Sequence, residues 1–235
     1  MKISIHQPEH LPWLGLLNKI HLSEVFVILD TVQFNRRNFQ HRNKIRNPSK
    51  DGFAWLTVPF ENTGLHTKII DVKISEKIDW KKKYLEVIKA NYINSKYFEY
   101  YFTALSDIIN KNHTKLAVLN VELLNFILNE FKIETKIVYA SKLELPKAEG
   151  GNEVILSICK KLEATRYLSG SGGKNYLQED MFNVAGITID FIEFHHPQYS
   201  QQYSPFLPFM SSIDLLFNHG AKEAQKILFN INTNE

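Results

Sequence analysis

The chain has 235 residues, enough for one large domain or two small ones. Its 28 Lys and Arg against 25 Asp and Glu give a net charge of +3, which does not support bulk binding of nucleic acid. A hydrophobic fraction of 44% with 23% charged residues is ordinary for a globular protein and excludes a disordered chain. The single cysteine, Cys159, excludes an internal disulfide and a thiolate zinc cluster.

The first 30 residues predict a parallel strand–helix–strand unit. An apolar strand at residues 3–5 is followed by an apolar helical face at residues 14–20, and residues 25–29 form a continuous apolar run typical of a strand buried on both faces. Polar side chains stand where the two strands end: His6 and Gln7 after the first, Asp30 after the second. Since α/β folds bind ligands at the carboxyl ends of parallel strands, we expect these three residues to line a cleft.

A basic loop is predicted after the second strand. Residues 34–50 contain Arg and Lys but no acidic residue, and asparagines are mixed among them. We expect Arg37 to bind a phosphate or carboxylate, and Gln33 and Asn43 to form hydrogen bonds with a polar ligand. A solvated basic face is the alternative interpretation of such a charge run.

The middle of the chain predicts helices. Apolar residues recur at helical spacing from about residue 80 to residue 131, and no Gly or Pro interrupts them. We interpret the whole chain, 1–235, as a single α/β domain with a helical insertion at about 78–132.

Strands and helices alternate again in the final third, which favours a parallel sheet of Rossmann-like type with a central all-helical insertion. Two polar segments follow predicted strands there. The turn at residues 169–174 is rich in Ser and Gly. Its glycines let the backbone approach an anion closely, and Lys174 at its end adds a positive charge. His195 follows the last strand, and Gln201 lies in the His, Gln and Tyr cluster after it.

No run of about 18 apolar residues is present, so we expect no membrane span. The N-terminus turns polar after residue 5 and has no signal-peptide core, which together with the lone cysteine favours a cytoplasmic protein. Cys159 lies in an apolar helical run and is interpreted as a core residue.

The polar segments at both ends of the chain resemble the WbqC-like family of bacterial proteins. The resemblance is carried by IHQPEHLPWLGLLNKI, FVILDTVQFNRRNFQHRNKI, WLTVPF, RYLSGSGGKNYL and FHHPQYSQQYSPFLPFMSSIDLLFNHG. The family usually has an aromatic residue where this chain has His10, which leaves the role of His10 open. This resemblance implies a role in O-antigen and other surface (lipopolysaccharide) polysaccharide biosynthesis, as an aminoacyl or glycine transferase that acylates an amino sugar.

A second resemblance implies a mechanism. His6 and His10 at a strand end are similar to the HxGH signature of nucleotidylyl transferases, with Pro8 in place of its glycine. FVILDTVQF and SGSGGKNYL are similar to segments of pantothenate synthetase, which forms an acyl adenylate and then an amide. This resemblance implies ATP with Mg²⁺ as the cofactor of an adenylate route; no other cofactor and no protein-bound metal site is expected.

Together these observations predict one pocket lined from both ends of the chain. We expect His6 and Lys174 to stabilise phosphate charge, Arg37 to bind a phosphate or carboxylate, and His195 to act as a general base. Gln33 and Asp30 would position the acceptor, and the remaining lining residues are Gln7, Asn43 and Gln201. The partners would be an amino acid, a nucleotide-linked amino sugar and, in the carrier route, an acyl carrier protein. An ATP-dependent amide ligase and a non-catalytic module that binds nucleotide sugars are the alternatives.

Overall fold

The computed structural model describes residues 1–148 and 150–230, and the chain divides into two compact units. Unit 1 comprises Met1–Gln7, Gly15–Val32 and Glu134–His195. Unit 2 comprises Pro8–Leu14, Gln33–Ile133 and His196–Glu235. Both units are therefore built from segments that are far apart in the sequence.

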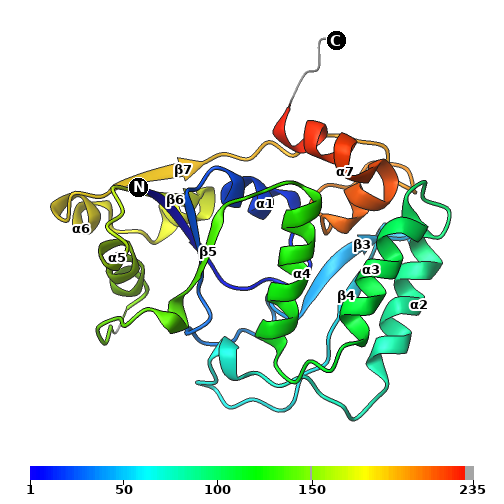
Figure 1. Cartoon of the computed structure of the whole chain (residues 1–235), viewed down its shortest axis with the longest axis horizontal. Helices are drawn as coiled ribbons and strands as arrows, with labels where there is room; N and C mark the ends of the chain where they lie inside the picture. The colour runs from blue at the N-terminus through cyan, green and yellow to red at the C-terminus, as the bar shows by residue number, and fades with distance from the viewer. Residues whose placement is uncertain (149, 231–235) are drawn as a thin grey trace. The chain divides into compact units, whose positions relative to one another are not determined.

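Unit 1 is a Rossmann-like α/β unit, which confirms the predicted fold class (Figure 1). All neighbouring strands of its five-stranded sheet are parallel, in the order β5-β2-β1-β6-β7. The strands are β1 (Lys2–His6), β2 (Val25–Ile28), β5 (Lys136–Tyr139), β6 (Arg166–Gly170) and β7 (Thr188–Ile192). The connecting helices are α1 (Leu14–His21), α5 (Gly151–Lys161) and α6 (Glu179–Val184), with 3₁₀ turns η2 (Ala140–Lys142) and η3 (Ser171–Asn175).

The apolar runs of the sequence form the core of unit 1. All four residues of β2 are buried, as expected for a strand covered on both faces. Ile3 and Ile5 of β1 belong to the same apolar cluster as Ile158 and Cys159 of α5. Cys159 is fully buried, and burial raises the pKa of its thiol to about 12, which confirms that it is a core residue.

Unit 2 combines a β-hairpin with helices. The strands β3 (Arg42–Arg46) and β4 (Phe53–Thr57) are antiparallel. The segment expected to be helical forms α2 (Trp80–Tyr92), α3 (Phe98–Asn110) and α4 (Leu116–Glu130). The short 3₁₀ turn η1 (Ile69–Asp71) precedes them, and the C-terminal helix α7 (Ile213–Phe229) is kinked at Gly220, where φ is 73°. None of the described helices is long and apolar enough to cross a membrane.

The prediction that residues 34–50 form a loop is wrong for β3. Along this strand, half-buried Arg42 and Lys44 alternate with buried Asn43 and Ile45, which is the period of a strand with one buried face. The guanidinium of Arg42 lies 4.1 Å from the centre of the Trp55 ring, so the cation itself covers an aromatic side chain of β4. The charges concealed the strand period in the sequence.

Candidate functional site

The strand order of unit 1 marks a candidate ligand crevice. The chain passes from β1 outward to β2 and β5, and then returns to the other side of β1 to add β6 and β7. In open α/β sheets, ligands bind outside the carboxyl ends of the strands at such a reversal, which here lies between β1 and β6. Because Ser4 pairs with Leu168, the ends of the two strands, His6 and Gly170, lie at the same level of the sheet. Gln7 directly follows His6 at this edge.

The hydrogen bonds of Lys19 fix the tautomer of His6. The Lys19 ammonium is 7% exposed and donates to the Ile5 carbonyl and to His6 Nδ1, both at 3.0 Å. An ammonium group has no lone pair, so Nδ1 must accept, and the proton of the neutral imidazole stands on Nε2. The remaining ring nitrogen of His6 is therefore an N–H donor, a group of the kind that binds the oxygen of an anion.

The glycine-rich turn after β6 contains two kinds of glycine. A Cβ on Gly173 would stand 2.1 Å from Ser169 Oγ and 2.9 Å from Leu177 Cδ1, so the side chains of Ser169 and Leu177 would have to move and packing favours glycine there. A Cβ on Gly170 or Gly172 would meet no neighbouring group within 4 Å, and neither residue has a positive φ. Packing and backbone conformation do not require glycine at these two positions, whereas close approach of a ligand to the main chain would.

Lys174 and His195 complete the polar groups at this edge of unit 1. The Lys174 ammonium stands 3.4 Å from the Glu193 carboxylate, and both side chains are more than half exposed, at 52% and 66%. An exposed pair of this kind contributes little stability, so an anionic ligand can replace Glu193 at little cost. His195 follows β7 and is exposed.

Asp30 is held by the turn that follows β5. Its side chain is 3% exposed, and its carboxylate accepts hydrogen bonds from the Ser141 backbone N–H at 2.9 Å and from the Ser141 hydroxyl at 2.6 Å. These bonds tie the end of β2 to η2. They orient the carboxylate and give Asp30 a structural role within unit 1.

The remaining predicted site residues, Gln33, Arg37, Asn43 and Gln201, belong to unit 2. Asn43 is buried and donates from Nδ2 to the carbonyls of His10 and Leu11, at 3.1 and 2.8 Å. Leu11 has a φ of 42°, so Asn43 supports a left-handed backbone position that a leucine rarely adopts. Gln201 accepts from the backbone N–H of Leu207 and donates to the carbonyl of the same residue, and it also donates to Asp214 Oδ2 at 3.0 Å. Both amides are therefore occupied by bonds within unit 2.

The two other predicted residues of unit 2 lie on its surface. Gln33 donates from Nε2 to the Leu65 carbonyl. Arg36 is fixed by the side chains of Asn62 and Thr63. The neighbouring Arg37 is exposed, and within residues 1–148 and 150–230 its guanidinium takes part in no hydrogen bond or ion pair. Arg37 is therefore available to an anion, and whether it shares one pocket with His6 and Lys174 stays a prediction.

His10 belongs to a buried polar network. Asn120 Nδ2 donates to the carbonyls of Pro8 and Gln40, so Asn120 Oδ1 accepts from His10 Nδ1 at 2.9 Å. His10 Nε2 then accepts from the Tyr84 hydroxyl at 2.6 Å. Burial lowers the pKa of His10 to about 4, so it is neutral near pH 7 and joins α2 and α4 to the segment around residue 10.

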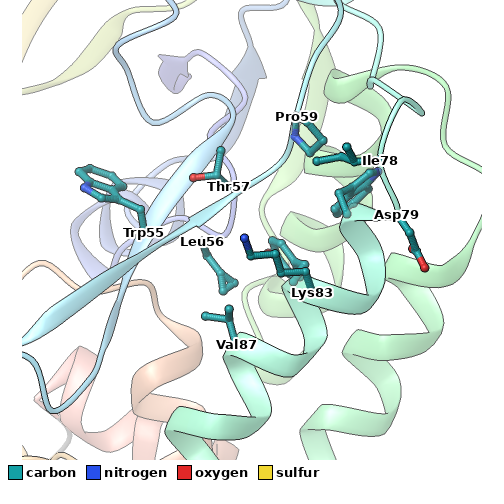
Figure 2. Close-up of a pocket in the computed structure, with 10 residues that line it drawn as sticks. Trp55, Leu56, Thr57, Pro59, Ile78, Asp79, Lys83 and Val87 are labelled. Carbon is teal, nitrogen blue, oxygen red and sulfur yellow. The ribbon is translucent and has the colours of Figure 1, made fainter.

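A pocket of unit 2 was missed by the sequence. A cavity of about 580 Å³ lies between β4 and α2, and no predicted site residue lines it (Figure 2). Its lining is mostly apolar and comprises Trp55, Leu56, Thr57, Pro59, Ile78, Asp79, Trp80, Lys83, Tyr84 and Val87. Helical periodicity marks Tyr84 and Val87 as core residues, and Lys83 belongs to a run of three lysines that resembles a solvated face. The sequence therefore contained no indication of a pocket between these residues and β4.

The part of the chain that the structure describes contains no group of three or more His, Cys, Asp or Glu side chains that could hold a metal ion. At the edge of unit 1, Lys174 supplies a cation and His6 an N–H donor. They suit phosphate or carboxylate oxygens.

Comparisons with known proteins identify the family. Residues 7–226 match the WbqC-like protein family. The chain is 32% identical over 224 residues to a protein of Mycobacterium tuberculosis (strain ATCC 25618 / H37Rv) named Uncharacterized protein Rv1507c, and the match covers 94% of this chain and 95% of that protein. No solved structure shows a significant match. On this match, which spans most of its length, the chain belongs to the WbqC-like protein family.

Proposed function

We propose that the protein is a transferase that adds an aminoacyl group, glycine in the first instance, to the amine of a nucleotide-linked amino sugar. In this proposal it acts in the cytoplasm, in the synthesis of a bacterial surface polysaccharide such as O-antigen. The observation that carries the proposal is the reversal of strand order between β1 and β6: His6 ends β1, Gly170 ends β6, and Gly172 and Lys174 lie in η3, which follows β6.

Phosphate binding is the step that unit 1 supports best. The N–H of His6 and the ammonium of Lys174 are donors suited to phosphate oxygens. Gly170 and Gly172 have no Cβ, so a phosphate has room to lie against the main chain there. A nucleotide-linked sugar supplies such a group, and Arg37 would add a bidentate contact.

The chemical step is an acyl transfer. The neutral amine of the sugar attacks the carbonyl carbon of an activated glycine, the amide bond forms, and the leaving group departs with the electron pair of the broken bond. With a carrier thioester the leaving group is a thiolate, and with an adenylate made from ATP and Mg²⁺ it is AMP. The amine loses one proton in either route, and His195, which is exposed at the end of unit 1, is the group that would accept it.

A non-catalytic module for nucleotide sugars is the second candidate, and the bonding of Asp30 favours it. The carboxylate already accepts two hydrogen bonds from Ser141, so it is oriented by the fold and not by a reacting group. A module of this kind would use the same crevice and form no product.

The experiment that tests the proposal is an incubation of the pure protein with glycine and a nucleotide-linked amino sugar, followed by mass spectrometry. One arm contains ATP and Mg²⁺, and a second contains glycine bound to a carrier protein as a thioester. A product heavier by one glycyl group supports transfer, and AMP release identifies the adenylate route. Tight binding with no product in either arm would leave the binding module.

Two glycine variants test the crevice itself. Gly172→Ala adds a methyl group in open space, so we expect the fold to be retained and nucleotide-sugar binding to weaken by about 10-fold or more. Gly64→Ala is the matched control, because its methyl group meets only Thr67 Oγ1 at 3.8 Å in unit 2. If both variants bind as the parent does, the glycine-rich turn is only a connection between β6 and α6.

A pair of histidine variants tests the tautomer of His6. His6→Gln keeps an N–H near the position of Nε2, and we expect it to retain far more binding than His6→Ala. If the two variants lose binding equally, His6 does not act through this donor.

A further inference from the structure

The outer edge of β4 is open. Val58 N–H donates to the His41 carbonyl at 2.8 Å, and the register of the hairpin continues from there. Because residues of an antiparallel ladder alternate between facing the partner strand and facing away from it, Trp55 and Thr57 turn their N–H and C=O groups away from β3. Among the described residues, no group bonds to these outward backbone groups.

The outer edge of β3, by contrast, is covered. The outward N–H of Arg46 donates to the Tyr92 hydroxyl at 3.0 Å, and the outward carbonyl of Lys44 accepts from the Ser211 N–H at 2.8 Å. Natural edge strands are commonly protected by charged residues or proline, but β4 reads Phe-Ala-Trp-Leu-Thr. The open edge of β4 is thus an unprotected template for another strand.

The pocket of unit 2 lies beside this edge. It holds about 580 Å³, a size typical of ligand pockets, between the hairpin and α2. Trp55 is 38% exposed and Ile78 is 62% exposed, so apolar surface remains to be buried there. Figure 2 shows the Lys83 ammonium directed toward β4, while the Asp79 carboxylate turns away.

The charge around the edge selects the partner. Arg42 stands over the Trp55 ring, the Lys44 ammonium stands 4.3 Å from the centre of the Phe53 ring, and Lys83 faces the strand from α2. Pairing with β4 of a second copy would bring two such sets of cations together, and like charges across a strand pair are destabilising. An acidic strand would satisfy them.

We propose that the open edge of β4 binds an extended acidic peptide segment of another protein as an added strand. The outward backbone groups of Trp55 and Thr57 pair with the segment's main chain, and an apolar side chain of the segment enters the pocket. Its acidic side chains meet Arg42, Lys44 and Lys83. This interaction surface lies entirely in unit 2 and does not depend on the proposed transferase activity.

Amide hydrogen exchange measured by NMR tests the proposal directly. The probe is an acetylated, C-terminally amidated hexapeptide of the sequence EVEIEV, added to the full chain. We expect exchange at the Trp55 and Thr57 amides to slow by about 10-fold or more at saturation. The amides of Ala54 and Leu56 already face β3 and serve as internal controls, because their exchange should change little.

Three comparisons separate strand addition from other modes of binding. A probe that is N-methylated at alternate residues cannot pair along the edge, so it should bind at least about 10-fold more weakly. Thr57→Pro removes an outward N–H from an edge strand and should also abolish binding, while Thr57→Ala keeps the N–H and should not. Lys83→Gln should weaken binding, and Lys82→Gln, at a neighbouring exposed position outside the lining, is its matched control.

Several results would overturn the proposal. Binding of the probe without slower exchange at Trp55 and Thr57, or equal binding of the N-methylated probe, would make the cavity a ligand pocket without strand addition. Slower exchange that grows with protein concentration alone, together with doubled mass in sedimentation, would assign the edge to a second copy of the chain. Absence of binding by both the acidic probe and its lysine-for-glutamate version would show that the edge takes no such strand.

Discussion

The buried neutral state of His10 makes the stability of unit 2 depend on pH. Burial lowers the pKa of His10 from 6.5 to about 4, so the unfolded chain binds its proton at a higher pH than the folded chain does. The unfolded state therefore gains relative to the folded state as the pH falls from about 6.5 toward about 4. The full effect is about 3 kcal/mol, since one pKa unit equals about 1.36 kcal/mol, and about 2 kcal/mol of it is lost between about pH 7.5 and about pH 5.

Denaturation by urea, followed by tryptophan fluorescence, measures this loss of stability in unit 2. The three tryptophans of the chain, Trp13, Trp55 and Trp80, all lie in that unit. His10→Gln is the reference variant. Its amide can donate to Asn120 and accept from Tyr84, but it does not titrate. Subtracting the pH effect of the variant from that of the parent removes the contributions of other groups, such as His41 and His196, whose pKa values burial also lowers.

The expected difference between parent and variant is about 2 kcal/mol, with the parent losing more stability at the lower pH. A difference under about 0.5 kcal/mol would refute the argument, because His10 would then titrate alike in the folded and unfolded chains. A difference of the opposite sign would mean that the folded chain prefers the charged imidazole, which the burial of His10 opposes.

Three other buried groups give predictions of their own. Arg46→Lys should lower the free energy of unfolding by about 3 kcal/mol, because the buried guanidinium donates from Nη1 to the Gly52 carbonyl and from Nη2 to the carbonyls of Tyr203 and Pro205, at 2.6 and 2.8 Å, and the single nitrogen of an ammonium cannot reproduce that two-nitrogen fork. Urea denaturation measures the change, and an unchanged midpoint would show the fork to be dispensable. Cys159 should not react with iodoacetamide at about pH 8 until the chain unfolds, because burial raises the pKa of its thiol to about 12. Mass spectrometry of the alkylated chain measures the reaction, and rapid labelling of the folded chain would contradict the prediction. Asp30→Ala should speed hydrogen exchange at the Ser141 amide by about 5-fold or more, because the variant removes the oxygen that accepts from this amide. Unchanged exchange would show that this bond does not protect the amide.

Local patterns predicted the frame of unit 1 well. β2 could be predicted from the sequence because a strand buried on both faces is a continuous apolar run, with no alternation of polar and apolar residues. The strand ends at His6 and Gly170 follow from the same logic, since polar residues begin where burial stops. The glycine-rich turn was visible by composition, but only packing distances separate Gly173, where a side chain would displace its neighbours, from Gly172, where it would meet open space.

Long-range contacts set the limit of prediction in unit 2. Asn43 was expected to face a ligand, yet its amide holds the carbonyls of residues that are 32 and 33 positions away. His10 meets Asn120 and Tyr84 only after α2 and α4 have packed, 110 and 74 positions along the chain. Residue type reveals that such a side chain needs partners, but not whether the fold or a ligand supplies them.

The same distinction decides what His6 can do. A histidine at a strand end suits a general base as well as an anion donor, and its position in the sequence does not separate the two roles. The ammonium of Lys19 separates them, because its hydrogen bond occupies Nδ1 and leaves the proton on Nε2. In the proposed transfer, His6 would therefore stabilise negative charge, and the base must come from another group, such as the exposed His195. The division of work between the two histidines thus rests on one buried lysine, which composition alone would count as a surface charge.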